Sequence, residues 1–324
     1  MLKIKSKLGR RLPLVKKLLL IEGISRTGKF LLNNLLAGIN SIEPGQCHTA
    51  LENIPRLIRL GFLDKLAGQE LLRIVVDQYC YEMLIGRNSF NYRLPDKSYI
   101  FNNPRHQIFF ERYRASDGAA AVKKFYREKL FSSFIAHETL PNIQIFLNTF
   151  PQLKVLSIQR SPIALVYSWF KRNLDKRTGS DPIMGEMIFS NRNLTTPWYL
   201  ISKAVEYNSL NKNADRTILA IETLFKINKI TFKKLAPSSR SKILFLHYED
   251  LTTNPHPILK KISAFLNKKI IPSALNKIIK SEGLPNPKSN DLTIKIKELS
   301  QIASPSYFKR LLKLEAEYTS RSLF

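Results

Sequence analysis

The stretch LLLIEGISRTGKFLLNNLL, residues 18–36, constrains the fold more than any other part of this chain. It begins with an apolar run, Leu18 to Ile21, which is typical of a buried parallel strand. A polar loop with Gly23 and Gly28 follows, and apolar residues at helical spacing come after it. The order of strand, glycine loop and helix start brings free backbone N–H groups and the positive end of a helix dipole together. This arrangement predicts a binding site for phosphate or sulfate.

The spacing of Gly23, Gly28 and Lys29 fits the first seven positions of a Walker A loop, but Phe30 stands at the eighth. A nucleotide-hydrolysing loop needs serine or threonine there, because that hydroxyl binds Mg²⁺. We therefore expect an anion-binding loop that works without a metal, with Arg26 and Lys29 adding two full charges. Taken alone, the stretch also fits a plain glycine turn with two solvated cations.

Composition places the chain among ordinary globular proteins, but its charge is unusual. Of its 324 residues, 44% are hydrophobic and 24% are charged. The 52 Lys and Arg residues outnumber the 25 Asp and Glu residues, which gives a formal net charge of +27. Such a surface favours anionic partners, namely nucleic acid, acidic glycan, anionic lipid or a multiply charged cofactor. Charge alone does not choose among them.

Cysteine and histidine spacing along the chain predicts no metal site. Cys47 and Cys80 are the only cysteines, so neither a disulfide framework nor a CxxC motif is present. The five histidines are scattered, with none at zinc-ligand spacing: His48, His106, His137, His247 and His256.

The apolar runs are too short to predict a transmembrane segment, which needs about 18 residues or more. We therefore expect a cytoplasmic protein. The N-terminus has a basic start like that of a signal peptide, but its apolar part runs directly into the glycine loop. A weak contact with a membrane surface is an alternative use of its basic residues: Lys3, Lys5, Lys7, Arg10 and Arg11.

Further apolar runs predict buried strands that alternate with helices. The expected strands are residues 134–137, 154–158 and 242–246, with a short one near residues 99–101; residues 172–197 read as a long loop. Alternation of this kind implies an α/β fold, a three-layer α/β/α architecture with a central parallel sheet, P-loop-like, with helical insertions. We expect one domain over residues 1–324, with its core at about 18–267, a helical insert at about 50–84 and a C-terminal helical extension at about 268–324.

Polar residues follow the predicted strands at their carboxyl ends, where parallel sheets bind ligands. Arg160 comes after the strand at 154–158, and Ser161 and Pro162 open the next helix as N-cap and first residue. Ser168 lies about two turns further along that helix, and Tyr248 follows the last predicted strand. Arg160 and Ser168, taken singly, also fit a surface ion pair and a helix-filling residue.

Taken together, three segments resemble the family of sulfotransferases that use 3′-phosphoadenosine 5′-phosphosulfate (PAPS). GISRTGKFLL, residues 23–32, looks like the family's loop for the 5′-phosphosulfate. VLSIQRSPIALVYSWF, residues 155–170, looks like its 3′-phosphate segment, in which an arginine precedes a serine by eight places. ILFLHYEDLTTNPHPILKKISAFLN, residues 243–267, resembles its third recurring block. The matches come in family order.

The resemblance implies a role for each matched residue. The loop residues would hold the 5′-phosphosulfate: Ser25, Arg26, Thr27, Gly28, Lys29 and Phe30. Arg26 and Lys29 would also act in catalysis, by stabilising negative charge on the leaving bridging oxygen. Arg160 and Ser168 would bind the 3′-phosphate, which distinguishes PAPS from ATP, and Tyr248 would lie near the adenine.

A catalytic base is expected near the end of the strand at 134–137. The acceptor hydroxyl must lose its proton as it attacks sulfur, and an imidazole that titrates near neutral pH can take it. The resemblance implies this role for His137, with Glu138 as the alternative base. His137 also fits a polar residue that caps the next helix.

The chain departs from the family pattern at several positions. Lys29 and Phe30 stand where two hydroxyl residues are usual, and Ile135 replaces a lysine of the cytosolic branch. No Arg-Lys-Gly segment stands near the C-terminus, where Lys288 is a weak substitute. The resemblance is therefore to a divergent member, closer to the glycan-modifying or bacterial branches.

The sequence thus predicts a sulfotransferase that moves a sulfuryl group from PAPS to a hydroxyl of a small-molecule or glycan acceptor, and a carbohydrate or glycoconjugate is expected. No metal is needed, and residues 50–84 and 172–197 are expected to form the acceptor walls. One alternative is a P-loop kinase, which would need a magnesium ligand after Lys29. The other is a basic nucleic-acid-binding protein without catalysis, for which no recognised motif accompanies the charge.

Overall fold

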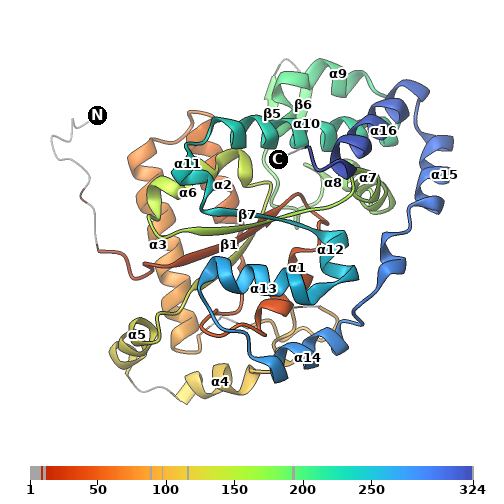
Figure 1. The fold of residues 1–324 in the computed structure, drawn as a ribbon. Helices are drawn as coiled ribbons and strands as arrows, with labels where there is room; N and C mark the ends of the chain where they lie inside the picture. The colour runs from red at the N-terminus through yellow and green to blue at the C-terminus, as the bar shows by residue number, and fades with distance from the viewer. Residues whose placement is uncertain are drawn as a thin grey trace, which may run out of the picture.

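The computed structural model describes residues 9, 12–87, 90–96, 98–114, 117–191 and 194–322. At its centre is a five-stranded sheet in the order β2-β3-β1-β4-β7, in which every neighbouring pair is parallel (Figure 1). The strands are β1 (Leu18–Gly23), β2 (Gln46–Cys47), β3 (Ser132–His137), β4 (Lys154–Gln159) and β7 (Ile243–His247). The predicted parallel sheet is therefore confirmed.

Helices cover both faces of the sheet. Leu19, Ile21 and Ile135 point to one face, where they pack against four helices: α1 (Lys29–Leu36), α12 (Tyr248–Thr253), α13 (Pro255–Leu266) and α14 (Pro272–Ser281). Leu20 and Phe134 point to the other face, which four helices cover: α2 (Thr49–Arg59), α3 (Lys65–Leu84), α5 (Gly118–Arg127) and α6 (Ile143–Thr149). Alternation of side chains along each strand explains the two buried faces. This is the predicted three-layer α/β/α architecture.

A third apolar cluster joins the C-terminal helices to the sheet. It contains Ile24 from the glycine loop and side chains of four helices: α7 (Pro162–Lys171), α10 (Asn213–Lys234), α15 (Thr293–Ile302) and α16 (Pro305–Thr319). The other helices are short: α4 (His106–Phe110), α8 (Leu174–Arg177), α9 (Ala204–Ser209), α11 (Pro237–Arg240) and the 3₁₀ turns at Ile100–Asn102, Glu111–Arg114, Leu140–Asn142, Trp198–Lys203 and Pro287–Asn290. The C-terminal part thus reaches the edge of the sheet where β1 ends (Figure 1).

The long apolar runs were predicted as strands, and the structure confirms them as β3, β4 and β7. The predicted start of α7 is also confirmed, because the Ser161 hydroxyl accepts a hydrogen bond from the Ala164 N–H at 3.2 Å and Pro162 is the first helical residue. Residues 50–84, where the sequence predicted helical structure, lie mainly in the two helices α2 and α3.

Two local predictions were wrong. Residues 99–101 do not form a strand but enter a 3₁₀ turn, because Phe101 packs on Phe110 and His106, with ring centroids 4.8 and 5.3 Å away. The long loop at residues 172–197 contains helix α8 and an antiparallel hairpin of β5 (Ile188–Asn191) and β6 (Leu194–Pro197).

Two sequence expectations concern membranes. The basic residues proposed for a membrane-surface contact all fall outside the described residues: Lys3, Lys5, Lys7, Arg10 and Arg11. Within the described part of the chain, no helix combines the length and the apolar character that crossing a bilayer requires.

Candidate active site

The loop between β1 and α1 is the centre of the site. It runs from Ile24 to Gly28 at the carboxyl edge of the sheet. Arg26 and Gly28 have left-handed backbone conformations, with φ of 77° and 99°. A non-glycine residue held in this region is strained and is found mostly at functional turns. A Cβ atom on Gly28 would lie 2.4 Å from the Tyr248 ring, so the close approach of Tyr248 requires glycine here.

Neighbouring groups hold the loop in place. The Thr27 hydroxyl donates to the Ile24 carbonyl at 2.9 Å and is buried with the rest of that side chain. The Ser25 N–H donates to Glu138 Oε1 at 2.6 Å, and Trp169 Nε1 donates to the Ser25 carbonyl at 2.9 Å. The loop is therefore fixed from α7 on one side and from the end of β3 on the other.

The structure brings the three predicted strand ends together. Arg160, which follows β4, donates through Nη1 to the Arg26 carbonyl at 2.8 Å. Its guanidinium lies over the ring of Tyr248, 4.3 Å from the centroid, and Tyr248 in turn contacts Gly28. These residues line a cavity of about 490 Å³ that also reaches His137.

Three guanidinium groups gather at this cavity and form no ion pair with a described carboxylate. Burial lowers the pKa of Arg26, and the positive charges of Arg172 and Arg160 lower it further. Within the described ranges, none of these three guanidinium groups has a carboxylate at ion-pair distance. Arg160 Nε is buried without a hydrogen-bond partner. Burial lowers the pKa of Lys295 on α15, and the nearby positive charge of Arg160 lowers it further. Uncompensated positive charge beside a helix N-terminus stabilises a bound polyanion.

Ser168, expected at the 3′-phosphate, contacts a neighbouring arginine of the site. It is half-buried on α7, and its hydroxyl accepts a hydrogen bond from Arg172 Nη1 at 3.2 Å. It does not line the cavity that contains Arg160. Ser168 therefore contacts the basic cluster through Arg172.

Lys29 and Phe30 replace hydroxyl residues at the start of α1, and they point in different directions. The Lys29 ammonium is buried under the loop, where it donates to the carbonyls of Gly23 and Ile24 at 2.7 and 2.9 Å. Burial lowers its pKa, while the nearby carboxylates of Glu138 and other glutamates oppose this shift. Phe30 is half-buried and lines both the large cavity and a neighbouring one of about 310 Å³.

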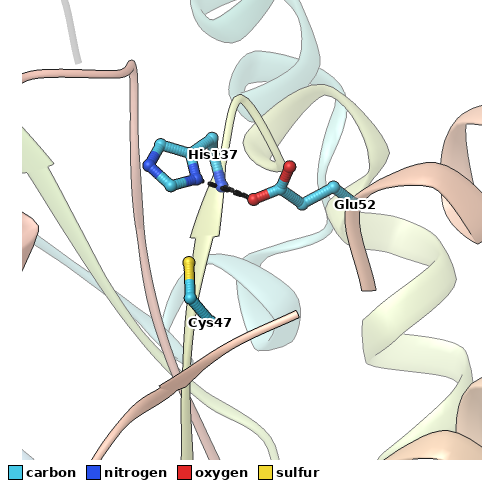
Figure 2. Close-up of side chains that lie close together, drawn as sticks. All are labelled: Cys47, Glu52 and His137. Carbon is cyan, nitrogen blue, oxygen red and sulfur yellow. Dashed lines mark hydrogen bonds and ion pairs between the residues drawn. The ribbon is translucent and has the colours of Figure 1, made fainter. Parts of the chain in front are cut away.

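His137 ends β3 and is held by Glu52 of α2 (Figure 2). Its Nδ1 lies 2.7 Å from Glu52 Oε1, which also accepts the His137 backbone N–H at 2.8 Å. Burial and the charge of Lys29 lower the pKa of His137. Hydrogen bonds with Cys47 and Glu52, together with the Glu52 charge, outweigh them and raise that pKa to about 9. The imidazole is therefore protonated at neutral pH in the free protein.

Glu138, the alternative base, is committed to other contacts. It is 3% exposed and has a left-handed backbone with φ of 49°. One carboxylate oxygen accepts the Ser25 N–H, and the other lies 3.4 Å from Arg56 Nη2. These contacts tie the glycine loop to α2, and Glu138 also lines a cavity of about 260 Å³ beside His137.

A buried cation at Arg56 organises the acidic residues behind this region. Arg56 is fully buried, and besides Glu138 it contacts Glu186 at 3.2 Å, the His137 carbonyl at 3.0 Å and the ring of Trp198 at 5.1 Å. Burial raises the pKa of Glu186 to about 7, although the Arg56 charge opposes the shift. Burial also raises the pKa of Glu22 in β1 to about 7, although the hydrogen bond from Ser157 and the charge of Lys29 oppose the shift.

A second cavity, of about 260 Å³, lies beside His137. Glu52 of α2 forms part of its wall, and Trp169 and Tyr199 add aromatic surface. The segment expected to be a loop supplies six further residues: Leu174, Thr178, Ile183, Met184, Gly185 and Glu186. Because Ser25 and His137 line both this cavity and the basic one, the two cavities meet at the glycine loop.

Comparison with known proteins identifies the family. The family model described as "Sulfotransferase domain" matches residues 82–313, well over half of the chain. This chain belongs to the sulfotransferase domain family. The matched range includes Arg160, Tyr248 and His137, while the glycine loop lies N-terminal to it.

The chain is also similar to one curated relative and to two solved structures. Cytosolic sulfotransferase 3 of Arabidopsis thaliana is 27% identical over 135 residues, which cover 36% of this chain and 41% of that protein. The match thus spans less than half the length of that relative. The sulfotransferase domain from the curacin biosynthetic pathway has a similar fold, with a TM-score of 0.51 and 13% identity over 95% of this chain and 99% of that one. A sulfotransferase domain from the olefin synthase of Synechococcus PCC 7002 gives 0.49 and 15% identity over 97% and 98%.

Several residues of the site were not found from the sequence. Glu52 and Arg56 are four residues apart on α2, and this spacing signals a helical ion pair but not its complete burial. Arg172, Glu186 and Lys295 lie in segments without a distinctive pattern, so the sequence held no signal for them.

Proposed function

We propose that this protein transfers a sulfuryl group from PAPS to a hydroxyl of a carbohydrate or glycoconjugate acceptor. The observation that carries the proposal is the group of guanidinium side chains of Arg26 and Arg160. They meet at the end of three parallel strands, next to His137 and without an ion pair to any described carboxylate. Membership of the sulfotransferase domain family supports the reaction class.

The described residues fit the donor, because Arg160 Nε is a buried donor without an acceptor among them and the neighbouring positive charges of Arg26, Arg160 and Arg172 lie close together. In this proposal, the N–H groups of Arg26, Gly28 and Lys29, with the Arg26 guanidinium, hold the 5′-phosphosulfate, while Ser25 keeps the loop in place through its N–H bond to Glu138. Thr27 and Lys29 act from within the loop, Thr27 by fixing the turn and Lys29 by placing an ammonium beneath it. Phe30 forms the apolar side of the same cavity.

The 3′-phosphate end is assigned to Arg160 and to the residues around it. A guanidinium binds phosphate oxygens in bidentate fashion, which makes Arg160 the principal contact. Ser168 contributes by orienting Arg172, and Lys295 adds charge from α15. Tyr248 offers its ring to the adenosine, next to Arg160.

His137 is proposed as the base that removes the proton of the acceptor hydroxyl. Glu52 fixes the ring through Nδ1, which leaves Nε2 as the atom that takes the proton. Because the pKa of His137 is raised to about 9, the base form is scarce at neutral pH and grows as the pH rises. Arg26 stabilises negative charge on the departing phosphate oxygen. Glu138 supports this geometry by holding the Ser25 N–H.

The cavity beside His137 is proposed to receive the acceptor. Its wall combines the aromatic rings of Trp169 and Tyr199 with polar groups of Thr49, Thr178 and Glu186, a mixture that suits a polyhydroxylated ligand. The helical insert and residues 172–197 thus serve as the acceptor walls. We also infer a cytoplasmic location, which the name of the Arabidopsis relative supports.

The test is transfer of radiolabelled sulfate from PAPS to a panel of neutral and acidic oligosaccharides. We expect a labelled product from the full chain, and we expect His137→Ala to lower its rate at least a hundredfold while binding of desulfonated donor (PAP) stays within about twofold, because general-base catalysis contributes about 10²–10⁴. His106→Ala, remote from the site on α4, is the matched control and should keep the wild-type rate. Magnesium-dependent ATP binding with no transfer from PAPS would contradict the proposal.

A further inference from the structure

Three side chains that bind transition metals meet at the rim of the second cavity (Figure 2). They are the thiol of Cys47, the carboxylate of Glu52 and the imidazole of His137. One ligand atom from each lies within 4.8 Å of the other two. Cys47 is exposed, whereas Glu52 is 9% and His137 24% exposed. The cluster is thus open to solvent on one side and enclosed on the other.

The parallel sheet brings these side chains together. β2 pairs with β3 so that Cys47 lies beside Ile135, two residues before His137. Alternation along the strands places Cys47 and His137 on the same face. Five residues after Cys47, Glu52 follows in the first turn of α2, which is fixed because His48 Nδ1 accepts the Ala50 N–H at 3.0 Å. Each ligand therefore stands on an ordered element.

We propose that Cys47, Glu52 and His137 bind one divalent ion of the zinc class. A thiolate, an imidazole and a carboxylate are the ligand types that zinc takes, and three protein ligands leave a fourth position for water. That position opens to the cavity of about 260 Å³, which all three side chains line. Binding would replace the hydrogen bond between His137 Nδ1 and Glu52 and would release two protons to solvent, one from the His137 imidazolium and one from the Cys47 thiol.

Some of the surrounding charged groups support binding of a metal ion here, and others oppose it. Arg56 Nη2 lies 3.9 Å from Glu52 Oε2, so it orients the carboxylate as an outer-shell partner. The Lys29 ammonium, whose charge reaches both His137 and Cys47, opposes a second cation. The sequence predicted no metal site because its cysteines and histidines are far apart along the chain; the sheet removes that separation.

The ion has no part in sulfuryl transfer. It would occupy the imidazole proposed as the base and the rim of the acceptor cavity, and so would inhibit the reaction. This consequence rests on the proposed function, whereas metal binding itself does not.

The test uses the full chain, first treated with a chelator and held in buffer without PAPS or acceptor. We titrate Co²⁺ as a spectroscopic probe and Zn²⁺ by calorimetry. The expected result is one ion per chain and a thiolate-to-cobalt charge-transfer band. Cys47→Ala should abolish the band and weaken Zn²⁺ binding at least about tenfold. Cys80→Ala is the matched control, because Cys80 is the other cysteine and is buried in the core, 2% exposed.

The possible results separate this site from the proposed function. The absence of a cobalt band, or a band that survives Cys47→Ala, would overturn the metal site. Glu52→Gln, which keeps the side-chain shape, is a second ligand variant that should weaken Zn²⁺ binding and keeps the test decisive if Cys47→Ala fails to fold. Zinc binding in a protein that never transfers sulfate would refute the proposed function and leave the metal site standing. Transfer activity without zinc binding would overturn the metal site and leave the proposed function standing.

Discussion

The cavity at the glycine loop and the buried cluster around Arg56 both contain charged side chains, but the arginines are unpaired in the first and paired with carboxylates in the second. At the cavity, Arg26 and Arg160 are partly accessible and have no acidic partners within the described residues. Around Arg56, a fully buried guanidinium contacts Glu138 and Glu186 and lies near Glu52. Unpaired charge in a cavity indicates a binding site for a ligand of opposite charge, whereas paired and buried charge indicates a structural role. The two arginine groups should therefore respond to mutation in different ways.

The largest expected effect is on stability, at Arg56. Arg56→Met removes the fully buried guanidinium that contacts Glu138 and Glu186 and lies near Glu52. Breaking a buried ion pair from one side costs about 3–5 kcal/mol, and urea denaturation would measure the change in free energy of unfolding. Arg160→Met, the matched change in the open cavity, should alter that free energy by less than about 1 kcal/mol. Similar losses for both variants would remove the distinction between the two regions.

The second effect is the pH dependence of stability at Glu186. Burial raises its pKa to about 7 in the folded state, above the ordinary value of 4.5. Between these values the folded state binds more protons than the unfolded state, so this group makes stability fall as the pH rises from about 4.5 to 7, by at most about 3 kcal/mol. Glu186→Gln should flatten that slope in denaturation series across this range. An unchanged slope would show that Glu186 does not titrate as described.

A smaller effect concerns the pH profile of catalysis. Glu52 contributes to the raised pKa of His137, so the rate limb governed by the base should rise with pH up to about 9. Glu52→Gln removes the negative charge and should move this limb to lower pH by about one unit, a change of about 1.4 kcal/mol in the ionisation of His137. Steady-state rates from pH 6 to 10 would check this. A limb that stays in place would exclude His137 as the titrating base.

The sequence predicted the main strands and the residues at their ends because both signals are local. β3, β4 and β7 are contiguous apolar runs, and Arg160 and Tyr248 directly follow two of them. The roles of Arg56 and Glu186 were out of reach, because a charged residue on an amphipathic helix or in a glycine-containing segment ordinarily faces solvent. β2 has only two residues, too few for any periodicity, so the approach of Cys47 to His137 could not be inferred either.

The most direct test of the account is calorimetric binding of PAP to the wild-type chain and to Arg160→Ala. The control is Arg127→Ala, which removes an exposed arginine at the end of α5. A charge-assisted hydrogen bond contributes about 1.5–3 kcal/mol, so Arg160→Ala should weaken PAP binding by about tenfold to a hundredfold. Arg127→Ala should leave it unchanged. Equal affinities of the wild type and Arg160→Ala for PAP would contradict the assignment of the basic cavity as the donor site.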